Sequence, residues 1–501
     1  MTGSGTDVVI SGAGPTGLML ALWLARLGVR VRVADLKAGP VLETRAIAVQ
    51  ARTLEFYDQL GIGEEALRRG RHFDRISLFV RGMQRAAVRL KDVGDDLTPH
   101  PYLYILTQDQ NEELLVSELS RLGVTVDWQT EVMAVTQGED GVTVMFRRAG
   151  QDEGVRAAYV AACDGAGSVV RHALGISLSG GTYSQRFFVA DVDAHGAVRE
   201  GNLNLSLDSH QFLAFFPMPQ PDRYRVVGEY PPGVDEAVGF PAVQPQLEAS
   251  RLAGVSAVHW FATYRVHHRV ADTFQRGRAF ILGDAGHVHT PVGGQGMNTG
   301  LGDASNLAWK LAQAVRGRPA ALTTYDAERR PFALSLVNTT DRIFTTVVNP
   351  SALAGWVRTV LVPLVMPRVM HFRPMRRFLF LTISQTRLHY PDSPLSEGRA
   401  GRIAGGQRLP WVRGAAGEGD NFAALRSLSW QVHVYGTPDP ALLTWCGVRD
   451  LPLRAFPFSA RAKRAGLAQD AIYVIRPDGY VGLALPSFDR ERLDAYTDRW
   501  L

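Results

Sequence analysis

Residues Asp7–Asp35 read DVVISGAGPTGLMLALWLARLGVRVRVAD, and this stretch decides the fold of the N-terminal part of the chain. A short β-branched run leads into GAGPTG (Gly12–Gly17), which is followed by an apolar helical stretch and a second strand, Val29–Ala34. The order strand, G-x-G-x-x-G, helix, strand is typical of a βαβ unit that binds a dinucleotide. The sequence therefore predicts a Rossmann-like domain here.

Each glycine in this turn has a physical role in such a unit. Gly12 permits the tight turn, Gly14 lets a pyrophosphate approach the backbone, and Gly17 lets helix and strand pack closely. The helix N-terminus presents N–H groups to the phosphates. Asp35, at the end of the second strand, is placed to accept hydrogen bonds from a ribose. We expect the whole turn to line the cofactor site: Gly12, Ala13, Gly14, Pro15, Thr16 and Gly17.

A second glycine-rich stretch, GDAGHVHTPVGGQGMNTG (Gly283–Gly300), lies between a predicted strand, Ala279–Leu282, and a helix expected from about Asn298. Asp284 follows the strand and can bind a polyol hydroxyl. The N–H groups of Gly293–Asn298 can meet an anionic ring edge, because a helix N-terminus favours negative charge.

Length and composition limit the class of protein. A chain of 501 residues, 46% of them hydrophobic, exceeds the size of a single core, so two or three domains are expected. The net charge of +5 comes with scattered arginines, which argues against nucleic acid as a partner. Cys163 and Cys446 stand far apart, which excludes a disulfide framework and a thiolate metal cluster and fits the cytoplasm.

The sequence predicts no membrane anchor. The apolar run Leu18–Ala25 has no basic residue before it, unlike a secretory signal. Ser351–Met370 is interrupted by arginines and a proline, so its longest uncharged piece is too short to span a bilayer. The sequence does not distinguish a monomer from a homodimer.

Four histidines raise the question of a metal site. His287 and His289 lie in the second glycine-rich stretch, whereas His267 and His268 belong to a different segment. No cysteine or acidic residue stands beside them in metal-ligand spacing. We expect no metal and interpret His287 as a buried hydrogen-bonding residue.

The pattern changes between about Gly181 and Val270, where short alternating runs such as RFFVADVDA and RYRVVGEY predict a largely antiparallel sheet. With Ile76–Leu90 these strands form a second domain, whose aromatic residues are numerous enough to line an apolar pocket. Only half of them can face one side, because side chains alternate along a strand. We expect Phe215 and Pro217 to lie near the substrate.

Beyond residue 335 the pattern becomes helical, and a break rich in Pro, Ser and Gly follows at Pro391–Gly406. The last hundred or so residues alternate strand and helix runs. Cys446 has no C-x-x-C partner, so a structural or assembly role is expected for this part rather than electron transfer.

Three motifs together carry a resemblance. Gly12–Gly17, CDGAGSVVR (Cys163–Arg171) and GDAGHVHTPVGGQGMNTGLGDA (Gly283–Ala304) resemble the class A flavoprotein monooxygenases, the p-hydroxybenzoate and phenol hydroxylase superfamily. ETRAIAVQARTLEFYDQLGI (Glu43–Ile62) and LTQDQNEELL (Leu106–Leu115) resemble it too, so the similarity runs from residue 7 to about 335. On length and on its C-terminal tail, the chain is most similar to the bacterial aromatic polyketide hydroxylases.

The patterns and the resemblance together predict an α/β and α+β protein. Its expected parts are a discontinuous Rossmann-like FAD-binding domain (1–75, 100–180 and 270–335), an antiparallel-sheet substrate domain (76–99 and 181–269), a helical segment (336–395) and a C-terminal domain (400–501). The resemblance to the polyketide hydroxylases implies that the C-terminal domain is thioredoxin-like.

The resemblance also implies roles for individual residues. Asp35 would bind the adenosine ribose and Asp284 the ribityl chain. Arg45 and Gln108 would contact the phosphate–ribityl region, and Asp164 would lie where FAD and the incoming nicotinamide nucleotide pass. The segment Pro291–Asn298, here called the ring-side loop, would run along the flavin. Its implied cofactor or catalytic contacts are Pro291, Gly293, Gly294, Gly296, Met297 and Asn298.

A protein of this kind would be an FAD-dependent monooxygenase that consumes NADPH or NADH and hydroxylates an aromatic, phenolic or polyketide-type substrate with O₂ through a flavin 4a-hydroperoxide. The protein would exclude water and position the substrate, and the sequence names no catalytic base. Two alternatives stay open, because fold does not fix function. One is a flavin-dependent Baeyer–Villiger oxygenase or reductase acting on a similar polycyclic substrate, and the other is a flavin-binding protein without catalysis.

Overall fold

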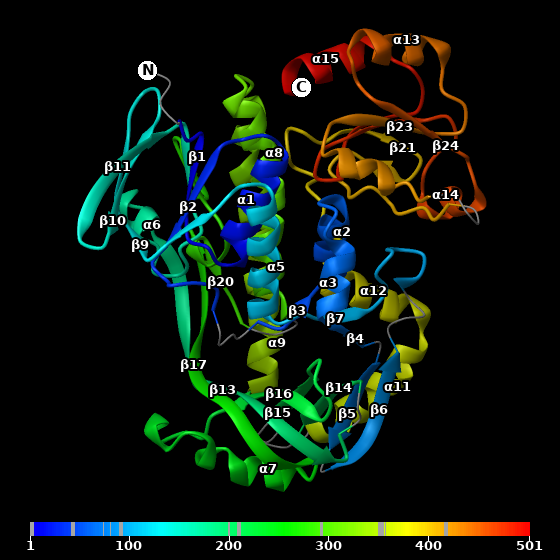
Figure 1. The fold of residues 1–501 in the computed structure, drawn as a ribbon. Helices are drawn as coiled ribbons and strands as arrows, with labels where there is room; N and C mark the ends of the chain where they lie inside the picture. The colour runs from blue at the N-terminus through cyan, green and yellow to red at the C-terminus, as the bar shows by residue number, and fades with distance from the viewer. Residues whose placement is uncertain are drawn as a thin grey trace.

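The computed structural model describes residues 5–41, 46–73, 75–80, 82–89, 94–198, 201–207, 212–290, 294–348, 355, 357–414 and 419–501. Figure 1 shows an N-terminal α/β part, a large curved sheet at the other end of the molecule, and a C-terminal domain packed beside the first part. Two 19-residue strands, β13 (Leu178–Gly196) and β17 (Ala253–Ala271), run from the first part into the large sheet. This architecture confirms the predicted combination of α/β and α+β folds.

The N-terminal part is built on the βαβ unit. β1 (Val8–Ser11) and β2 (Val31–Asp35) pair in parallel, with α1 (Pro15–Arg26) between them in the chain. They lie at the centre of a six-stranded sheet of order β18-β19-β12-β1-β2-β8, in which β18 is antiparallel to β19 and the other pairs are parallel. The other strands of this sheet are β8 (Val126–Trp128), β12 (Tyr159–Ala162), β18 (Gln275–Arg276) and β19 (Ala279–Ile281).

Helices pack against this sheet, and together with it they enclose one apolar core. The core draws mainly on residues from three stretches, 8–66, 104–176 and 270–337, so separate segments of the chain share one interior. The helices of this part are α1, α2 (Ala51–Gln59), α3 (Gly63–Arg69), α5 (Gln108–Arg121), α6 (Val169–Ala173) and α8 (Gly296–Val315), with the short turns η3 (Gly283–Ala285) and η5 (Ala320–Thr323). Two three-stranded sheets complete it: β3 (Ala48–Val49), β7 (Leu103–Ile105) and β4 (Arg71–Phe73), and β9 (Thr130–Gln137), β10 (Val142–Arg148) and β11 (Gln151–Ala157).

The second sheet has eight strands in the order β20-β17-β13-β16-β15-β14-β5-β6. Its pairs are antiparallel except for β14 with β5. Beside β13 and β17 it contains β5 (Arg75–Val80), β6 (Met83–Arg89), β14 (Leu203–Leu207), β15 (Phe212–Pro217), β16 (Arg223–Glu229) and β20 (His287–Val288). The boundaries expected at 180/181 and 269/270 fall inside β13 and β17, because both strands continue across them without a turn.

The two faces of the second sheet have different neighbours. The outer face packs on α7 (Gln244–Ser250) and the turns η1 (Glu236–Val238) and η2 (Phe240–Ala242), through residues such as Phe188, Phe215 and Leu247. The inner face meets the N-terminal part, where Phe216 and Leu203 pack with Phe73 and Leu103. A substrate held between this sheet and the N-terminal part would therefore meet the inner face.

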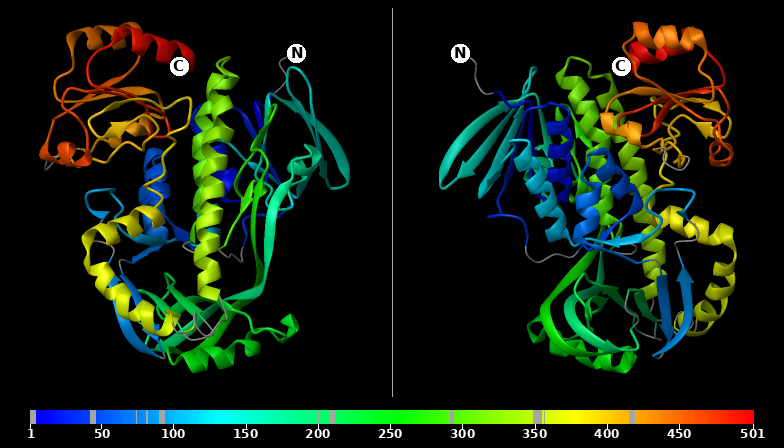
Figure 2. Two further views of the ribbon diagram at one scale, coloured as in Figure 1. Left: turned by 180° about the vertical axis from the view of Figure 1, so that it is seen from behind. Right: turned by 45° about the vertical axis from the view of Figure 1, so that its right-hand side comes forward.

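A helical segment follows. α9 (Thr324–Val348) runs from the N-terminal part toward the large sheet, as Figure 2 shows from behind. It is followed by a π-helical turn, η6 (Val357–Leu361), and by α11 (Val362–His371) and α12 (Arg373–Ile383), which turn back along the large sheet. Among the described residues, no helix combines the length and the apolar character needed to cross a membrane.

The C-terminal domain has a six-stranded sheet of order β22-β21-β26-β25-β23-β24. Its elements are β21 (Glu397–Ala400), β22 (Ile403–Ala404), η7 (Ala423–Ser427), β23 (Gln431–Tyr435), α13 (Pro440–Val448), β24 (Leu453–Phe456), α14 (Ala460–Ala465), β25 (Ile472–Ile475), β26 (Val481–Leu485) and α15 (Arg490–Trp500). Trp309 of α8 packs into the core of this domain beside Trp430. Burial raises the pKa of Cys446 to about 11, so this thiol is a core residue.

Buried ions join the C-terminal domain to the N-terminal part. The Arg476 guanidinium donates to both carboxylate oxygens of Glu328 at 2.7 and 3.0 Å, and Lys310 Nζ donates to Glu328 Oε2 at 2.8 Å. All three side chains are fully buried. Burial opposes the ionisation of Glu328, but the charges of Arg476 and Lys310 outweigh it and hold its pKa far below the ordinary value. The carboxylate therefore stays charged and needs both partners.

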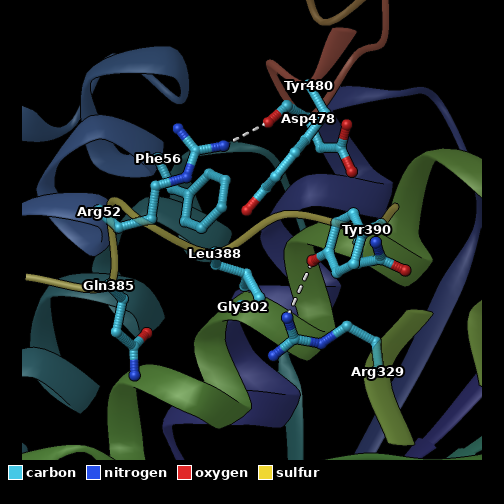
Figure 3. Close-up of a pocket in the computed structure, with 10 residues that line it drawn as sticks. Arg52, Phe56, Gly302, Arg329, Gln385, Leu388, Tyr390, Asp478 and Tyr480 are labelled. Atoms are coloured by element: carbon cyan, nitrogen blue, oxygen red, sulfur yellow. Dashed lines mark hydrogen bonds between the residues drawn. The ribbon is translucent and has the colours of Figure 1, made fainter. Parts of the chain in front are cut away.

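A small cavity of about 10 Å³, enough for one water molecule, lies at the same junction. Figure 3 shows its lining, with Arg52 donating to the Asp478 carbonyl at 2.7 Å and Arg329 donating to Tyr390 Oη at 2.9 Å. Each of these bonds connects the N-terminal part to the chain beyond α12, so the domain is held by directional contacts as well as by Trp309.

Replacing Arg476 by Ala should therefore destabilise the protein strongly, because Glu328 is left buried with half of its compensating charge. Removing one partner of a buried ion pair typically costs about 3–5 kcal/mol. Arg490→Ala is the matched control, since the Arg490 side chain is 77% exposed, and its effect should stay within about 0.5 kcal/mol. Urea denaturation followed by tryptophan fluorescence measures both, and equal midpoints for the two variants would contradict a structural role for the ion pair.

Candidate active site

Two of the three motifs, the G-x-G-x-x-G turn and Gly283–Ala304, meet at Thr16, near the N-terminus of α1. A Cβ atom added to Gly283 would lie 2.7 Å from Thr16 Oγ1, and one added to Gly300 would collide with the same hydroxyl. The G-x-G-x-x-G turn, the end of β19 and the first turns of α8 are therefore in direct contact. Glycines are needed here because the backbones approach too closely for side chains.

The glycines of the first motif differ in what surrounds them. Gly12 has φ +101°, and a Cβ atom there would collide with the Cys163 carbonyl; a Cβ atom on Gly17 would collide with the Gly12 carbonyl. Both are required by the fold itself. Gly14 has an ordinary φ of −79°, and a Cβ atom there would meet nothing within 4 Å. The chain thus leaves space at Gly14, above the N–H groups of α1, where a pyrophosphate would bind.

Asp35 holds the turn from the neighbouring strand. Its Oδ2 accepts from the Ala13 N–H at 2.6 Å, and its Oδ1 accepts from the Lys37 N–H at 2.8 Å. Each carboxylate oxygen has a second lone pair, so Asp35 can still accept from a ribose hydroxyl. The predicted role for Asp35 fits this geometry.

Glu112 is a residue of this site that sequence reasoning missed. It is fully buried in α5 and accepts from the Val41 N–H at 2.9 Å and from Gln108 Nε2 at 2.9 Å. Glu112 therefore positions Gln108, the predicted cofactor contact at the start of the helix. A glutamate inside the apolar face of a helix is the signal that could have found it. Arg45 lies outside the described residues.

Asp284 sits in η3, directly after β19, and is exposed. Asp303 of α8 holds its turn in place: the buried Asp303 carboxylate accepts from the Gly283 N–H at 3.0 Å, from His287 Nε2 at 2.7 Å and from Arg329 Nε at 2.6 Å. The buried hydrogen bond of His287 agrees with the expectation from the sequence, whereas Asp303 and Arg329 were not predicted. An acidic residue on the apolar side of α8 is again the available signal.

The second motif, Cys163–Arg171, lies against the same strand end. Arg171 Nη1 donates to the Ala285 carbonyl at 2.9 Å, and Arg171 Nη2 donates to the Ala166 carbonyl at 2.8 Å. Burial raises the pKa of Asp164, and its Oδ1 is buried without a hydrogen-bond partner in the protein. A buried acceptor of this kind needs a donor, and a ribose or ribityl hydroxyl would supply one.

The ring-side loop is described from Gly294 onward; Pro291 and Gly293 lie outside the described residues. α8 begins at Gly296, two residues before the expected start, so Gly296, Met297 and Asn298 form its first turn, whose N–H groups have no partner within the helix. The Asn298 amide is used fully: its Oδ1 accepts from the Gln50 N–H and Thr53 Oγ1, and its Nδ2 donates to the Ala48 and Gly294 carbonyls, all at 2.8 Å. Only the backbone of Asn298 is therefore available to a flavin.

His289 stands just before the ring-side loop. Burial lowers its pKa to about 4, so the ring is neutral at physiological pH, with Nδ1 against the Thr290 carbonyl at 2.8 Å and Nε2 buried without a partner. Within the described part of the chain, no three His, Cys, Asp or Glu residues are grouped as metal ligands.

Phe215 and Pro217 do not face the N-terminal part. Phe215 is completely buried in the outer layer under α7, and Pro217 lies two residues along the same strand and so on the same face. Their neighbour Phe216 packs on the inner face with Ile383. The expected residue and the observed one are therefore neighbours in the sequence, because adjacent side chains of a strand point to opposite faces.

These residues fit FAD. One path across the carboxyl ends of β1, β2 and β19 passes all of the features described above. They are the space at Gly14, the carboxylates of Asp35 and Asp284, the unpartnered Asp164 oxygen and the first turn of α8. This edge is where parallel sheets of this kind bind dinucleotides.

Comparisons with known proteins agree with this geometry. Residues 5–340 match the model of a family described as FAD binding domain. The chain is 33% identical over 516 aligned residues to the 6-methylpretetramide 4-monooxygenase of Streptomyces rimosus, covering 95% of this chain and 90% of that one. Among solved structures, the anhydrotetracycline hydroxylase OxyS of Streptomyces rimosus is 28% identical, with a TM-score of 0.77 over 99% of this chain and 98% of that one. A ternary complex of aklavinone-11 hydroxylase with FAD and aklavinone is 25% identical, with a TM-score of 0.79 over 100% of both chains.

Gly14→Val should abolish or strongly weaken FAD binding without unfolding the protein. A side chain there fills only the space left for the ligand, so the FAD dissociation constant should rise roughly tenfold or more, equivalent to about 1.4 kcal/mol. The measurements are flavin fluorescence titration of the apoprotein and its thermal midpoint, which should match the wild type.

Two glycine variants complete this test. Gly12→Val should fail to fold, because of the positive φ and the collision with Cys163, whereas Gly447→Ala, in open space on α13, should bind FAD normally. Normal FAD affinity in Gly14→Val would show that the ligand does not pass Gly14.

Proposed function

The chain belongs to the FAD binding domain family, and from this premise we propose that the protein is a monooxygenase that hydroxylates a fused-ring aromatic substrate of the polyketide type. The observation that carries the proposal is the contact of two glycine-rich motifs at Thr16, with space left at Gly14. The likeness over 95% of the chain to a monooxygenase of an aromatic polyketide supports the substrate class. The C-terminal domain is included in that likeness.

The chemistry that bound FAD would supply is acceptance of a hydride from NADPH or NADH and activation of O₂ for transfer of one oxygen atom. The chain's own contribution begins with the first turn of α8. Its N–H groups and the helix dipole stabilise negative charge on the ring edge that they face. Asn298 fixes this turn against the segment Ala48–Thr53, so the donors are held in place before the reaction.

We propose that the inner face of the large sheet holds the substrate. Phe216 offers an aromatic surface there, and Arg225, opposite it in the register, forms a buried pair with Asp191 at 2.6 and 2.7 Å. The Arg225 guanidinium also lies 5.3 Å from the ring centre of Trp260. Aromatic surface with a few fixed polar groups suits a flat, hydroxylated ring system.

A proton acceptor for a phenolic substrate lies on the same face. Tyr183 donates a hydrogen bond to Asp341 Oδ1, and His268 Nδ1 stands 3.9 Å from the same oxygen. β17 pairs with β20 at Arg269 and Val270, and the chain runs on from β20 to the ring-side loop, which supports placing this group on the side where the flavin is expected. A proton can pass from the substrate hydroxyl to Tyr183 Oη as the Tyr183 proton moves to Asp341, which increases the electron density of the ring to be hydroxylated.

The proposed reaction is tested with the FAD-loaded protein, NADPH, ¹⁸O₂ and a panel of phenolic anthraquinones and tetracyclic polyketides. We expect an accepted compound to accelerate NADPH consumption and to gain one ¹⁸O atom as a hydroxyl group on a ring carbon, established by mass spectrometry and NMR. An oxygen inserted into a ring would identify a Baeyer–Villiger oxygenase. Consumption of NADPH without ¹⁸O in the product would identify a reductase, and no stimulation by any compound a flavin-binding protein without catalysis.

Asp341→Asn should slow hydroxylation of a neutral phenol by about 10²–10⁴-fold, the usual contribution of general base catalysis. For a substrate analogue that is already ionised at the assay pH, the hydroxylation rate should fall far less. A structural defect would lower the rates of both substrates alike. Asp152→Asn, at an exposed position of β11, is the control. Equal losses for neutral and ionised substrates would remove Asp341 from the proton path.

A further inference from the structure

A cleft of about 610 Å³ lies away from the cofactor path, where three distant parts of the chain meet. One wall is the loop that contains Asp95 and Asp96, the second is α12 with the segment Thr386–His389, and the third is the C-terminal domain, including α14. Figure 1 shows this side of the molecule, with α14 above α12. The volume is that of a small-molecule site.

The cleft is strongly basic. Arg377 and Arg408 line it and form ion pairs with Asp96 and Glu55. Five more arginines line it and, among the residues that the structure describes, none of the five forms an ion pair with a carboxylate: Arg387, Arg402, Arg413, Arg461 and Arg464. The five arginines are exposed and Asp95 is the one further acidic residue in the described lining, so the cleft keeps a net positive charge that an anion bound between the guanidinium groups would compensate.

The chain holds several of these guanidinium groups in place through contacts that leave their charge uncompensated. Arg402 donates to the Arg464 carbonyl, and Arg461 donates to the Arg413 and Gly414 carbonyls, the latter at 3.1 Å. Arg387 lies over Phe378, 5.0 Å from its ring centre, and so is fixed without an acidic partner. Fixed, planar guanidinium groups bind phosphate oxygens in pairs, which favours phosphate over a single carboxylate.

One wall of the cleft is connected to the ring-side loop. The Ile383 carbonyl accepts from Gln295 Nε2 at 3.0 Å, and Gln385 Nε2 donates to Thr299 Oγ1 at 3.1 Å. The chain then continues through Thr386–His389 along the cleft, so the six residue steps from Ile383 to His389 span at most about 20 Å. A ligand in the cleft is therefore within a short length of chain of the loop that flanks the flavin.

We propose that this basic cleft is a binding site for a diphosphate group of the nucleotide type. Two sources share this chemistry: the reduced nicotinamide dinucleotide that the reaction consumes, and a separate phosphorylated ligand. The reductant as source rests on the proposed function, whereas diphosphate binding itself does not. No G-x-G-x-x-G turn other than the one at Gly12 occurs in the sequence, so the reductant has to bind through surface groups such as these.

Calorimetric titration of the FAD-loaded protein with inorganic pyrophosphate tests the site without any turnover. Arg387→Gln combined with Arg464→Gln should weaken pyrophosphate binding by roughly tenfold or more, because two forks are removed. The control is Arg68→Gln combined with Arg121→Gln, two arginines of the N-terminal part that are 74% and 68% exposed and whose loss changes the net charge equally. This control should bind pyrophosphate like the wild type. Absent binding, or equal weakening in both double variants, would overturn the proposal.

Steady-state kinetics then separate the two sources. If the reductant occupies the cleft, the cleft variant should raise the KM for NADPH by the factor seen with pyrophosphate and leave kcat unchanged. An unchanged KM together with lost pyrophosphate binding would assign the site to the separate phosphorylated ligand. Because the titration needs no substrate, a protein that fails to hydroxylate any aromatic compound would still report on the cleft.

Discussion

The carboxylate of Asp303 is the point on which the arrangement of the site depends. It is completely buried in α8, and it accepts hydrogen bonds from the backbone before Asp284, from His287 and from Arg329. A buried carboxylate is costly unless it is fully compensated, so these groups can take few other arrangements. Burial opposes its ionisation, but the charge of Arg329 outweighs burial and lowers the pKa of Asp303. The strand end that presents Asp284, the helix that faces the ring and the long helix α9 are thereby fixed to one another.

The same ionic chain continues to the C-terminal domain. Arg329 donates a hydrogen bond to Tyr390. Glu328, the preceding residue, accepts from Arg476 and Lys310. Burial lowers the pKa of Lys310 to about 8, yet Glu328 beside it keeps the network close to charge balance. Cys446 lies in the core of this domain. The contacts of the domain with α8 and α9 are those of a structural support for these two helices.

The large sheet separates two tasks by the alternation of its side chains. Its outer face has an apolar layer closed by α7, which gives the sheet its stability. Its inner face has both aromatic and charged residues, among them Phe216, Arg225 and Tyr183, so it can bind a flat polar ligand. β13 and β17 continue from this face to their pairing with β20, which precedes the ring-side loop in the chain. In the proposed function, this arrangement would couple the position of the substrate to that of the cofactor.

The sequence by itself determined the elements whose signal is local. The βαβ unit, the glycine pattern, Asp35, Asp284 and the start of α8 within two residues all follow from spacing and from the backbone needs of glycine, and the family followed from the same motifs. Only the tertiary structure decided which face of β15 meets the N-terminal part, because alternation along a strand does not show which of its two faces is turned inward. The structure places Phe216, not Phe215, on that face. It also revealed Asp303, Glu112 and the basic cleft, since these depend on groups up to several hundred residues apart, such as Asp96 and Arg377. An acidic residue on the apolar face of a helix shows in the sequence that a buried charge needs a partner, but only the folded chain shows which residue compensates it.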